Sequence, residues 1–240
     1  MSNSSKSFEE GRILALVAET QVEDKTTAVL KLRGHSLVAD CSGVLYWPEE
    51  DTLVVSDLHL EKGSSFAKKG MMVPPYDTGL TLDALTEAVM RYAPKRIISL
   101  GDSFHDGGGA ARLPLPYKEK LLAIMAERDW IWISGNHDPE PPEGLPGTTH
   151  FEVALGDLIF RHEPSEAYTR GEVAGHLHPA GKIKKRGRAV RRPCFISDTE
   201  RLIMPAFGAY TGGLNVAHKA FKGLFDETKK VAHLLGKDRS

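Results

Sequence analysis

Short apolar runs and amphipathic segments alternate along the first two-thirds of the chain. The apolar runs cover residues 53–55, 97–100 and 131–133. Runs of this kind are typical of strands buried on both faces of a sheet. Between them, residues 82–92 carry apolar side chains at helical spacing and stop before Pro94, and residues 117–128 repeat that spacing after Pro116. Strands alternating with helices predict a parallel sheet with right-handed crossovers.

The pattern changes in the second half, where short strand-like runs are separated by tight turns. These runs cover residues 149–154, 158–161, 172–174, 189–196 and 201–204. They predict a second, more antiparallel sheet. Near the start, residues 35–40 and 43–47 predict a hairpin that turns near Cys41. At the end, residues 217–235 predict a terminal helix packed on the body, so we expect two packed sheets with helices outside.

Length and composition predict one globular domain. The 240 residues are 41% hydrophobic, and we place a single domain at 31–240 after an N-terminal extension at 1–30, whose first ten residues form a loose tail. Lys and Arg (31) nearly balance Asp and Glu (32), which excludes a global basic field. Two cysteines without a CxxC motif fit a reducing compartment, and no signal peptide or membrane span is evident. We therefore expect a soluble cytoplasmic protein without a membrane partner.

Metal-ligand residue types follow the predicted strands, where each strand ends. They are Asp57, His59, Asp102, Asn136, His162, His176 and His178. Carboxyl ends of neighbouring strands converge on one crevice. Asp57 and His59, two apart, would project to the same side of an extended segment, as would His176 and His178. A single such motif is more often a turn or a core histidine, but five clusters in order indicate a metal site.

The mixture of carboxylate and imidazole ligands favours Mn, Fe or Zn over Mg or Ca. Two cations about 3.5–4 Å apart need a bridging carboxylate, and Asp102 after the middle strand is the natural bridge. Asn136 would supply a neutral oxygen. We expect two divalent metal ions, with Mn preferred.

Taken in order, the motifs Asp-x-His, Gly-Asp, Gly-Asn-His-Asp, a single His and Gly-His-x-His resemble the calcineurin-like metallophosphoesterase superfamily over residues 53–179. The resemblance implies a four-layer α/β/β/α sandwich of two mixed sheets flanked by helices. It assigns one metal to Asp57, His59, Asp102 and His178, and the other to Asp102, Asn136, His162 and His176. The second motif departs from the common pattern at Asp106, whose role stays open.

The resemblance implies phosphoester hydrolysis by metal-activated water. His137, beside a ligand but not itself one, would donate to the departing oxygen. Asp138 is the candidate that orients His137, with Asp106 as the second choice, while a turn or helix cap explains Asp138 equally well. We expect His105 to be a solvated loop histidine.

Further segments narrow the substrate class. Residues 61–67, 74–78, 192–195 and 205–215 look like the ligase-associated DNA damage response phosphoesterases (the PdeM family). That likeness implies a phosphodiesterase or endonuclease acting on single-stranded or damaged DNA in repair. It also implies functional association with a DNA ligase and a helicase or exonuclease.

Local basic residues agree with a nucleic-acid substrate, although most charge runs are solvated faces. The candidates are Lys62, Lys68, Lys184, Lys185 and Arg186. Tyr76 or Phe66 are candidates to stack a base. Two alternatives stay open: a hydrolase of small phosphodiesters or nucleotides, and a non-catalytic scaffold of the same fold.

Overall fold

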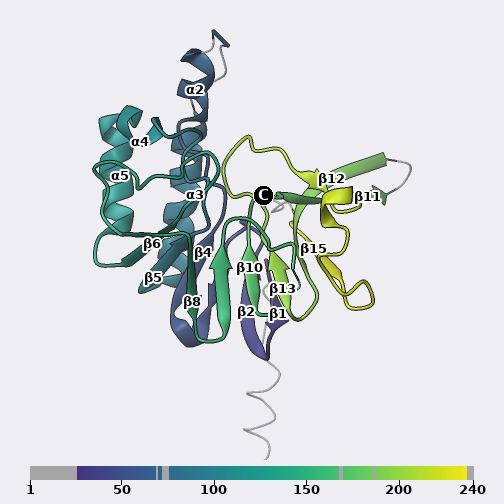
Figure 1. Ribbon diagram of the computed structural model, residues 1–240. Coiled ribbons are helices and arrows are strands. Elements are labelled where there is room, and N and C mark those ends of the chain that lie inside the picture. Colours follow the sequence, from purple (N-terminus) through teal and green to yellow (C-terminus); the bar gives the residue numbers. More distant parts are fainter. Residues whose placement is uncertain (1–25, 69, 72–75, 168–169, 186–187, 237–240) are drawn as a thin grey trace, which may run out of the picture.

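The computed structural model describes residues 26–68, 70–71, 76–167, 170–185 and 188–236 (Figure 1). The predicted loose tail therefore lies outside the described residues. Within them, two β-sheets pack face to face, and the helices lie on the outer face of the first sheet (Figure 1). This arrangement confirms the predicted α/β class with two mixed sheets flanked by helices.

Seven strands of the described chain form the first sheet, in sequence order. They are β1 (Thr27–Leu32), β2 (His35–Asp40), β3 (Leu45–Trp47), β4 (Thr52–Val55), β5 (Arg96–Ser99), β6 (Asp129–Ile133) and β7 (Thr148–His150). Strands β1 to β4 pair antiparallel, and β4 to β7 pair parallel. The predicted hairpin and parallel core are confirmed. Since β1 pairs with β2 along its whole length, the sheet takes in residues 27–30 of the predicted extension.

The central strands are buried on both faces, as their apolar runs predict. In β4, Leu53 and Val55 pack in the cluster beneath the helices, whereas Val54 faces the second sheet. In β5, Ile97 packs in the cluster beneath the helices, and Ile98 faces the second sheet. The period-2 alternation of a strand thus supplies two separate cores, one on each side of the first sheet.

Four α-helices connect or flank these strands in the described chain. They are α2 (Lys62–Lys68), α3 (Asp77–Tyr92), α4 (Gly109–Arg112) and α5 (Leu115–Met125). Helix α3 ends where expected, because Ala93 adopts a left-handed conformation before Pro94. Helix α5 ends three residues before the predicted position. There the backbone of Ala126 becomes extended, and the Arg128 guanidinium donates to the carbonyls of Ile124 and Ala126.

The second sheet is mixed, with four antiparallel and three parallel pairings in the described chain, so it is somewhat more antiparallel than the first, as predicted. Its strands are β8 (Glu152–Leu155), β9 (Leu158–Arg161), β10 (Glu172–Ala174), β11 (Pro179–Lys185), β12 (Arg188–Ser197), β13 (Arg201–Ile203), β14 (Leu214–Asn215) and β15 (Val231–Leu234). Strand β10 lies parallel to both of its neighbours, β9 and β13. The predicted single strand at 149–154 is wrong, because it breaks at the exposed Phe151: β7 joins the first sheet and β8 the second.

The predicted terminal helix is also wrong. Residues 217–235 form a short 3-10 helix, η2 (Lys219–Phe221), followed by a turn and β15. Gly223 has a φ of 81°, and Asp226 accepts a hydrogen bond from the Thr228 backbone, so the chain bends where a helix would continue. The apolar residues expected to pack on the body do so, because Phe221, Leu224 and Phe225 cover the outer face of the second sheet. This irregular segment stands where the four-layer sandwich has its outer helices.

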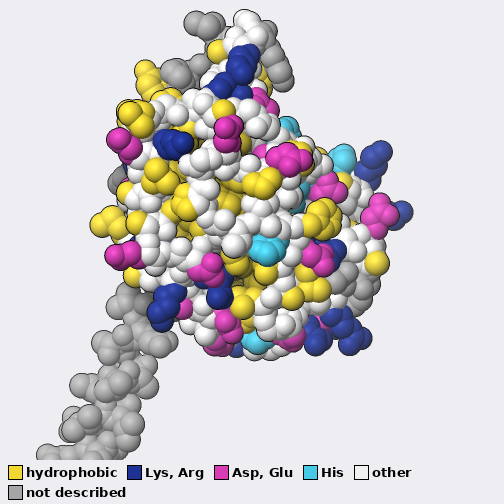
Figure 2. Space-filling model, turned by 60° about the vertical axis from the view of Figure 1, so that its left-hand side comes forward, with side chains coloured by type: hydrophobic (Ala, Val, Ile, Leu, Met, Phe, Trp, Pro, Cys, Tyr) yellow, Lys and Arg dark blue, Asp and Glu magenta, His cyan; other side chains and the backbone are white. Residues whose placement is uncertain are grey.

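No single charge dominates the face of the molecule drawn in Figure 2. Acidic and basic side chains are interspersed on the face drawn in Figure 2, in keeping with a net charge of −1. Another short 3-10 helix, η1 (Pro48–Glu50), joins β3 to β4. None of the helices in the described ranges is long and apolar enough to cross a membrane.

Candidate metal centre

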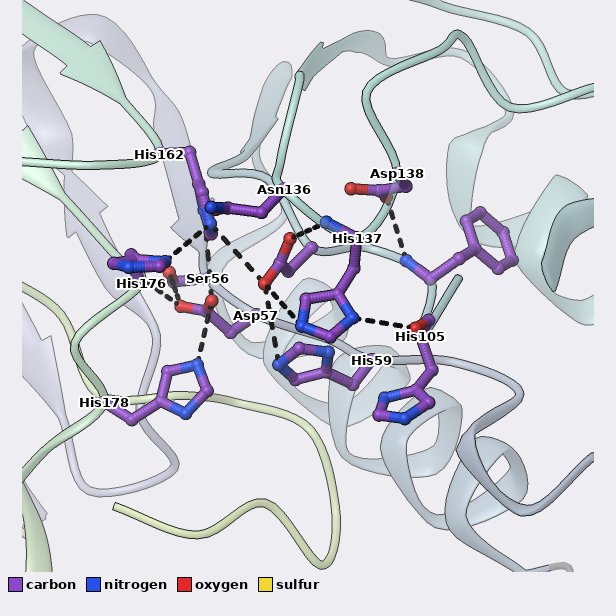
Figure 3. Close-up of polar contacts among 12 residues, drawn as sticks. Ser56, Asp57, His59, His105, Asn136, His137, Asp138, His162, His176 and His178 are labelled. Atoms are coloured by element: carbon purple, nitrogen blue, oxygen red, sulfur yellow. Dashed lines mark hydrogen bonds and ion pairs between the residues drawn. The ribbon is translucent and has the colours of Figure 1, made fainter. Parts of the chain in front are cut away.

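The predicted ligands come together at one edge of the two sheets. Asp57 and His59 follow β4, Asp102 follows β5, and Asn136 follows β6. From the second sheet, His162 follows β9, and His176 and His178 follow β10. The carboxyl ends of these strands therefore deliver side chains to one site, as the strand-end argument predicts (Figure 3).

The first cluster comprises Asp57, His59 and His178, whose ligand atoms lie within 4.8 Å of one another. Oδ1 of Asp57 is 3.0 Å from Nε2 of His178. These two atoms and Nδ1 of His59 are buried and make no hydrogen bond within the described chain. Buried polar atoms rarely lack partners, so the Asp57 and His178 atoms fit a site built for a cation.

The second cluster comprises Asp102, His162 and His176. Nδ1 of His176 lies 3.2 Å from Nε2 of His162. The other nitrogen of His162 is 2.8 Å from the Leu100 carbonyl oxygen, a contact that orients the ring in the way usual for metal-binding histidines. Both imidazoles are therefore held with a nitrogen toward the Asp102 carboxylate.

Asp102 lies between the two clusters. Its Oδ2 is 3.5 Å from Nε2 of His162 and 4.0 Å from Nε2 of His59, while its Oδ1 accepts a hydrogen bond from the His137 backbone. One oxygen is thus fixed by the protein, and the other faces a histidine from each cluster. This is the position that a bridging carboxylate requires.

Most of the ligand residues have a left-handed backbone conformation rather than an extended one, and this conformation sets the direction of their side chains. Five non-glycine residues of the two clusters have positive φ: Asp57, His59, Asp102, His176 and His178, with values from 44° to 64°. The Asp-x-His and His-x-His pairs therefore do not lie on extended segments, contrary to the prediction from the sequence. Such conformations are unfavourable for L-residues and cluster at functional sites, where surrounding structure enforces them.

Two motif glycines are present because the loops pack with no room for a side chain. A Cβ atom on Gly135 would lie 2.2 Å from the backbone nitrogen of Asp102. On Gly175 it would lie 2.0 Å from Oγ of Ser56 and 2.7 Å from Oδ2 of Asp57. The glycine of one motif thus makes space for the ligand of another.

Burial and neighbouring charge oppose each other at the ligands. Burial raises the pKa values of Asp57 and Asp102, but the adjacent histidines outweigh it, and both pKa values are lowered. Burial lowers the pKa of His59 to about 4, which keeps its ring neutral. Burial also lowers the pKa of His162, yet Asp102 and Asp57 raise it to about 9 overall. The carboxylates therefore stabilise positive charge here, and metal binding requires loss of the His162 proton.

Asn136 lies at the edge of the second cluster, near His162 (Figure 3). Its Nδ2 donates to Oε1 of Glu163 at 2.5 Å, an arrangement that leaves its amide oxygen as the ligand atom. The same Glu163 oxygen is 3.9 Å from Nε2 of His176. Sequence reasoning missed Glu163; its position directly after His162 was the available signal.

His137 faces the metal clusters but is not oriented by Asp138. Its Nε2 lies 3.9 Å from Oδ2 of Asp102, and its Nδ1 is 2.9 Å from the carbonyl oxygen of His105. Asp138 instead accepts a hydrogen bond from the Phe104 backbone, and its carboxylate does not point toward the His137 ring (Figure 3). The proposed pairing of His137 with Asp138 is therefore not found.

The second choice, Asp106, does not meet His137 either. Its carboxylate forms a two-point ion pair with Arg112, with both distances 2.8 Å. The His105 ring stacks on His137, with ring centres 5.3 Å apart, and contacts Phe66. His105 is thus part of the site rather than a solvated loop residue.

An open pocket of about 550 Å³ is lined by His59 and His178 of the first cluster and by Asp102 and His176 of the second. Its walls include Lys62, His105, His137 and the segment from Thr211 to Leu214. Of the other predicted substrate contacts, Lys68 is exposed on α2 and does not line the pocket. Lys184 and Lys185 lie on β11, and Arg186 lies outside the described residues.

The hairpin of β11 and β12 begins at the rim of this pocket. Strand β14 pairs with the start of β11, and its first residue, Leu214, lines the pocket. Arg191 on β12 donates a hydrogen bond to the Gly213 carbonyl on the same rim. Sequence reasoning identified the basic run but not this contact, which depends on the fold.

Comparison with known proteins supports a metal site that hydrolyses phosphoesters. The family model of calcineurin-like phosphoesterases matches residues 51–199, a span that contains every proposed metal ligand. No curated protein matches the sequence. Among solved structures, the chain is similar to a Pseudomonas putida nuclease, MPE, at 28% identity and a TM-score of 0.67. The similarity covers 80% of this chain and 92% of the nuclease.

Proposed function

Because the chain belongs to the calcineurin-like phosphoesterase family and is a metal-dependent hydrolase, we propose that it is a dinuclear phosphodiesterase or endonuclease that cleaves DNA. One observation carries this proposal: one open pocket is lined by two residues of each Asp/His cluster and also by Lys62. A phosphodiester can therefore contact cations and a basic side chain together. The similarity to the Pseudomonas putida nuclease supports a nucleic acid as the polymer, and the resemblance to the ligase-associated phosphoesterases favours DNA.

The residues fit two divalent cations, and we propose manganese, with iron or zinc as alternatives. Asp57, His59 and His178 would hold one ion, His162, His176 and Asn136 the other, and Asp102 would bridge them. Mixed oxygen and nitrogen donors suit these metals better than magnesium or calcium. When bound, the ions supply Lewis-acid charge that activates water and neutralises phosphoryl oxygens.

His137 is the proposed general acid. With the His105 carbonyl accepting from Nδ1, a protonated ring keeps its second N–H at Nε2, and this atom faces the pocket. It can donate to the oxygen that leaves phosphorus. The Asp102 carboxylate lies 3.9 Å from the same Nε2. Asp138 supports this step indirectly, by holding the backbone of Phe104 next to His105.

A DNA strand would be held by local basic groups, because the molecule has no global positive charge. Lys62 lies inside the pocket, and the hairpin with Lys184, Lys185 and Arg186 starts at its rim. Lys68 would contact phosphates further along the strand. The hydrogen bond from Arg191 to the Gly213 carbonyl supports a path for the DNA strand from the pocket along the hairpin.

The cellular part of the proposal rests on the resemblance to the ligase-associated phosphoesterases. We infer a role in DNA repair on single-stranded or damaged DNA, in functional association with a DNA ligase and a helicase or exonuclease. A cytoplasmic location is consistent with two cysteines that form no disulfide in the described chain. Affinity capture with the organism's own ligase tests the association directly.

The test uses protein stripped with chelator and reloaded with manganese. It receives an activated small phosphodiester and end-labelled single-stranded DNA in parallel, and Asp102→Ala serves as the inactive control. Cleavage of both substrates by the wild-type protein alone supports the proposal. Cleavage of the small ester alone would identify a small-phosphodiester hydrolase, and cleavage of neither would support a non-catalytic scaffold.

A further inference from the structure

A second pocket lies beside the metal pocket and has no place in the chemistry described so far. It has a volume of about 390 Å³ and is lined by Tyr76, Gly79, Leu80, Asp83, Tyr117, Lys120 and Tyr210. Its walls come from α3, α5 and the loop before β14. Three tyrosines therefore meet in one small depression.

Two of these tyrosines are unusually exposed. Tyr76 and Tyr210 each leave 64% of their surface accessible to solvent. Tyr210 also has a φ of 56°, a backbone conformation that L-residues seldom adopt. Exposed aromatic side chains that gather in a depression commonly mark a binding surface, because they gain little from contact with water.

The two pockets are neighbours along the chain and in space. Thr211 lines the metal pocket, and the preceding Tyr210 lines the tyrosine pocket. Lys62 lines the metal pocket, and its Nζ donates to the Tyr210 carbonyl oxygen at 3.0 Å. The ammonium group has two further N–H donors for an anion at this boundary.

We propose that Tyr76 and Tyr210 form a base-stacking subsite for single-stranded DNA, next to the phosphate bound at the metal centre. This inference rests on the proposed function. Lys62 would contact the phosphate that links the nucleotide at the metals to the nucleotide on the tyrosines. A single strand can place an unpaired base on an aromatic ring, whereas the bases of a duplex are already stacked. The subsite would therefore select single strands with little preference for sequence.

The composition of the pocket matches a nucleobase. Tyrosine rings offer flat apolar faces, and the Lys120 and Asp83 side chains, which form an ion pair, supply a donor and an acceptor at its edge. The metal centre and Lys62 account for the negatively charged backbone of the same ligand. No second class of ligand is needed to explain the two pockets together.

The test measures stacking and turnover separately. A short single-stranded oligonucleotide carrying 2-aminopurine is titrated with protein in calcium buffer, and its fluorescence falls when the base stacks. We expect Tyr76→Ala and Tyr210→Ala to weaken binding roughly 5- to 100-fold each and to restore the fluorescence. Tyr76→Phe and Tyr210→Phe keep the ring and should behave like the wild-type protein. Met90→Ala, an exposed apolar residue about 20 Å further along α3, is the matched control.

Manganese-loaded proteins supply the second readout. In the alanine variants, the KM for the oligonucleotide should rise while hydrolysis of the activated small diester is unchanged. If the wild-type protein hydrolyses the diester but the alanine variants bind the oligonucleotide normally, or if the wild-type protein binds no oligonucleotide, the subsite is overturned. If the oligonucleotide binds through the tyrosines but no phosphodiester is hydrolysed, the proposed function fails and the subsite stands.

Discussion

Oδ1 of Asp57 lies 3.0 Å from Nε2 of His178, yet neither atom makes a hydrogen bond within the described chain. The other oxygen of the same carboxylate is well supplied, because Ser56 and the His176 backbone both donate to it. The protein thus fixes the carboxylate through one oxygen and keeps the other toward an imidazole. A divalent cation held by both Oδ1 and Nε2 would satisfy the two atoms.

Metal content should respond to Asp102 more than to His178. His178→Ala removes a ligand of the first cluster only, so we expect a loss of about one metal ion per chain. Asp102→Ala removes the carboxylate between the clusters, so we expect loss of both ions. Elemental analysis of manganese-reconstituted proteins measures this, with Asp106→Ala, whose carboxylate pairs with Arg112, as the control. Two ions retained in Asp102→Ala would contradict the bridging role.

His137→Ala should keep both metals and lose rate. Removal of a general acid typically lowers a rate by about 10²–10⁴-fold, and the loss should be greatest for esters with poor leaving groups. Steady-state kinetics with a series of aryl phosphodiesters measure the dependence on the leaving group. His105→Ala is the matched control, because it removes a neighbouring ring but keeps the carbonyl that accepts from His137. Loss of metal from His137→Ala would make His137 a ligand instead.

Asp138 should make the metal-free protein less stable as pH rises. Burial raises the pKa of its carboxyl to about 7, against about 3.9 in the unfolded chain. Between these values the folded state keeps a proton that the unfolded state has released, so the free energy of unfolding falls as pH rises from about 4 to about 7 and then levels off. Asp138→Asn removes this loss. From pH 5 to pH 8 the variant should therefore gain on the order of 2–3 kcal/mol relative to the wild-type protein.

Urea denaturation of both metal-free proteins at pH 5 and pH 8 tests this difference. Asp106→Asn is a control whose stability difference from the wild-type protein should not change between pH 5 and pH 8, because Arg112 lowers the pKa of Asp106 and the carboxylate is charged at both pH values. The Asp106 carboxylate therefore stabilises the fold above about pH 4 and loses that effect as pH falls. A difference between wild type and Asp138→Asn that stays constant with pH would show that Asp138 is already charged when folded.

The sequence patterns predicted which residues are the metal ligands better than they predicted the backbone conformations that orient those residues. Each ligand type follows an apolar run, and strand ends are local features, so Asp57, Asp102 and His162 could be placed in advance. Their left-handed backbone could not, because it depends on loops that pack against one another across two sheets. The partners of His137 were missed for the same reason. The His105 carbonyl is a backbone group, and its identity carries no signal in the sequence.

The predictions of the fold are wrong where one sequence pattern is compatible with two structures. The spacing of Phe221, Leu224 and Phe225 is typical of a helix, but a compact irregular segment can bury the same side chains. Residues 149–154 look like one strand, but the two halves pair with different sheets. In both cases tertiary pairing decides the outcome, and spacing along the chain does not report it.

The basic hairpin should matter for polymers and not for small esters. We expect the triple variant Lys184→Ala, Lys185→Ala, Arg186→Ala to weaken binding of single-stranded DNA and to reduce its salt dependence, since each lost phosphate contact lowers the slope by about 0.7. Hydrolysis of a small diester should be unchanged. The matched control replaces Lys222, Lys229 and Lys230, which do not line the metal pocket. Equal losses with both substrates would show that the hairpin supports the fold of the site rather than DNA binding.

Gly135→Ala should disable the site although it replaces no ligand. The added Cβ would lie 2.2 Å from the Asp102 backbone nitrogen and 2.3 Å from its Oδ1, so the loop after β5 must move. Overpacking of this kind commonly costs about 1–3 kcal/mol of stability. Because the displaced carboxylate is the one between the clusters, metal content and activity should fall together with the melting temperature. Gly107→Ala, in the same loop as Asp102 but with open space around its Cβ, should leave all three unchanged. A Gly135→Ala protein with two bound ions would show that the loop can shift without separating the clusters.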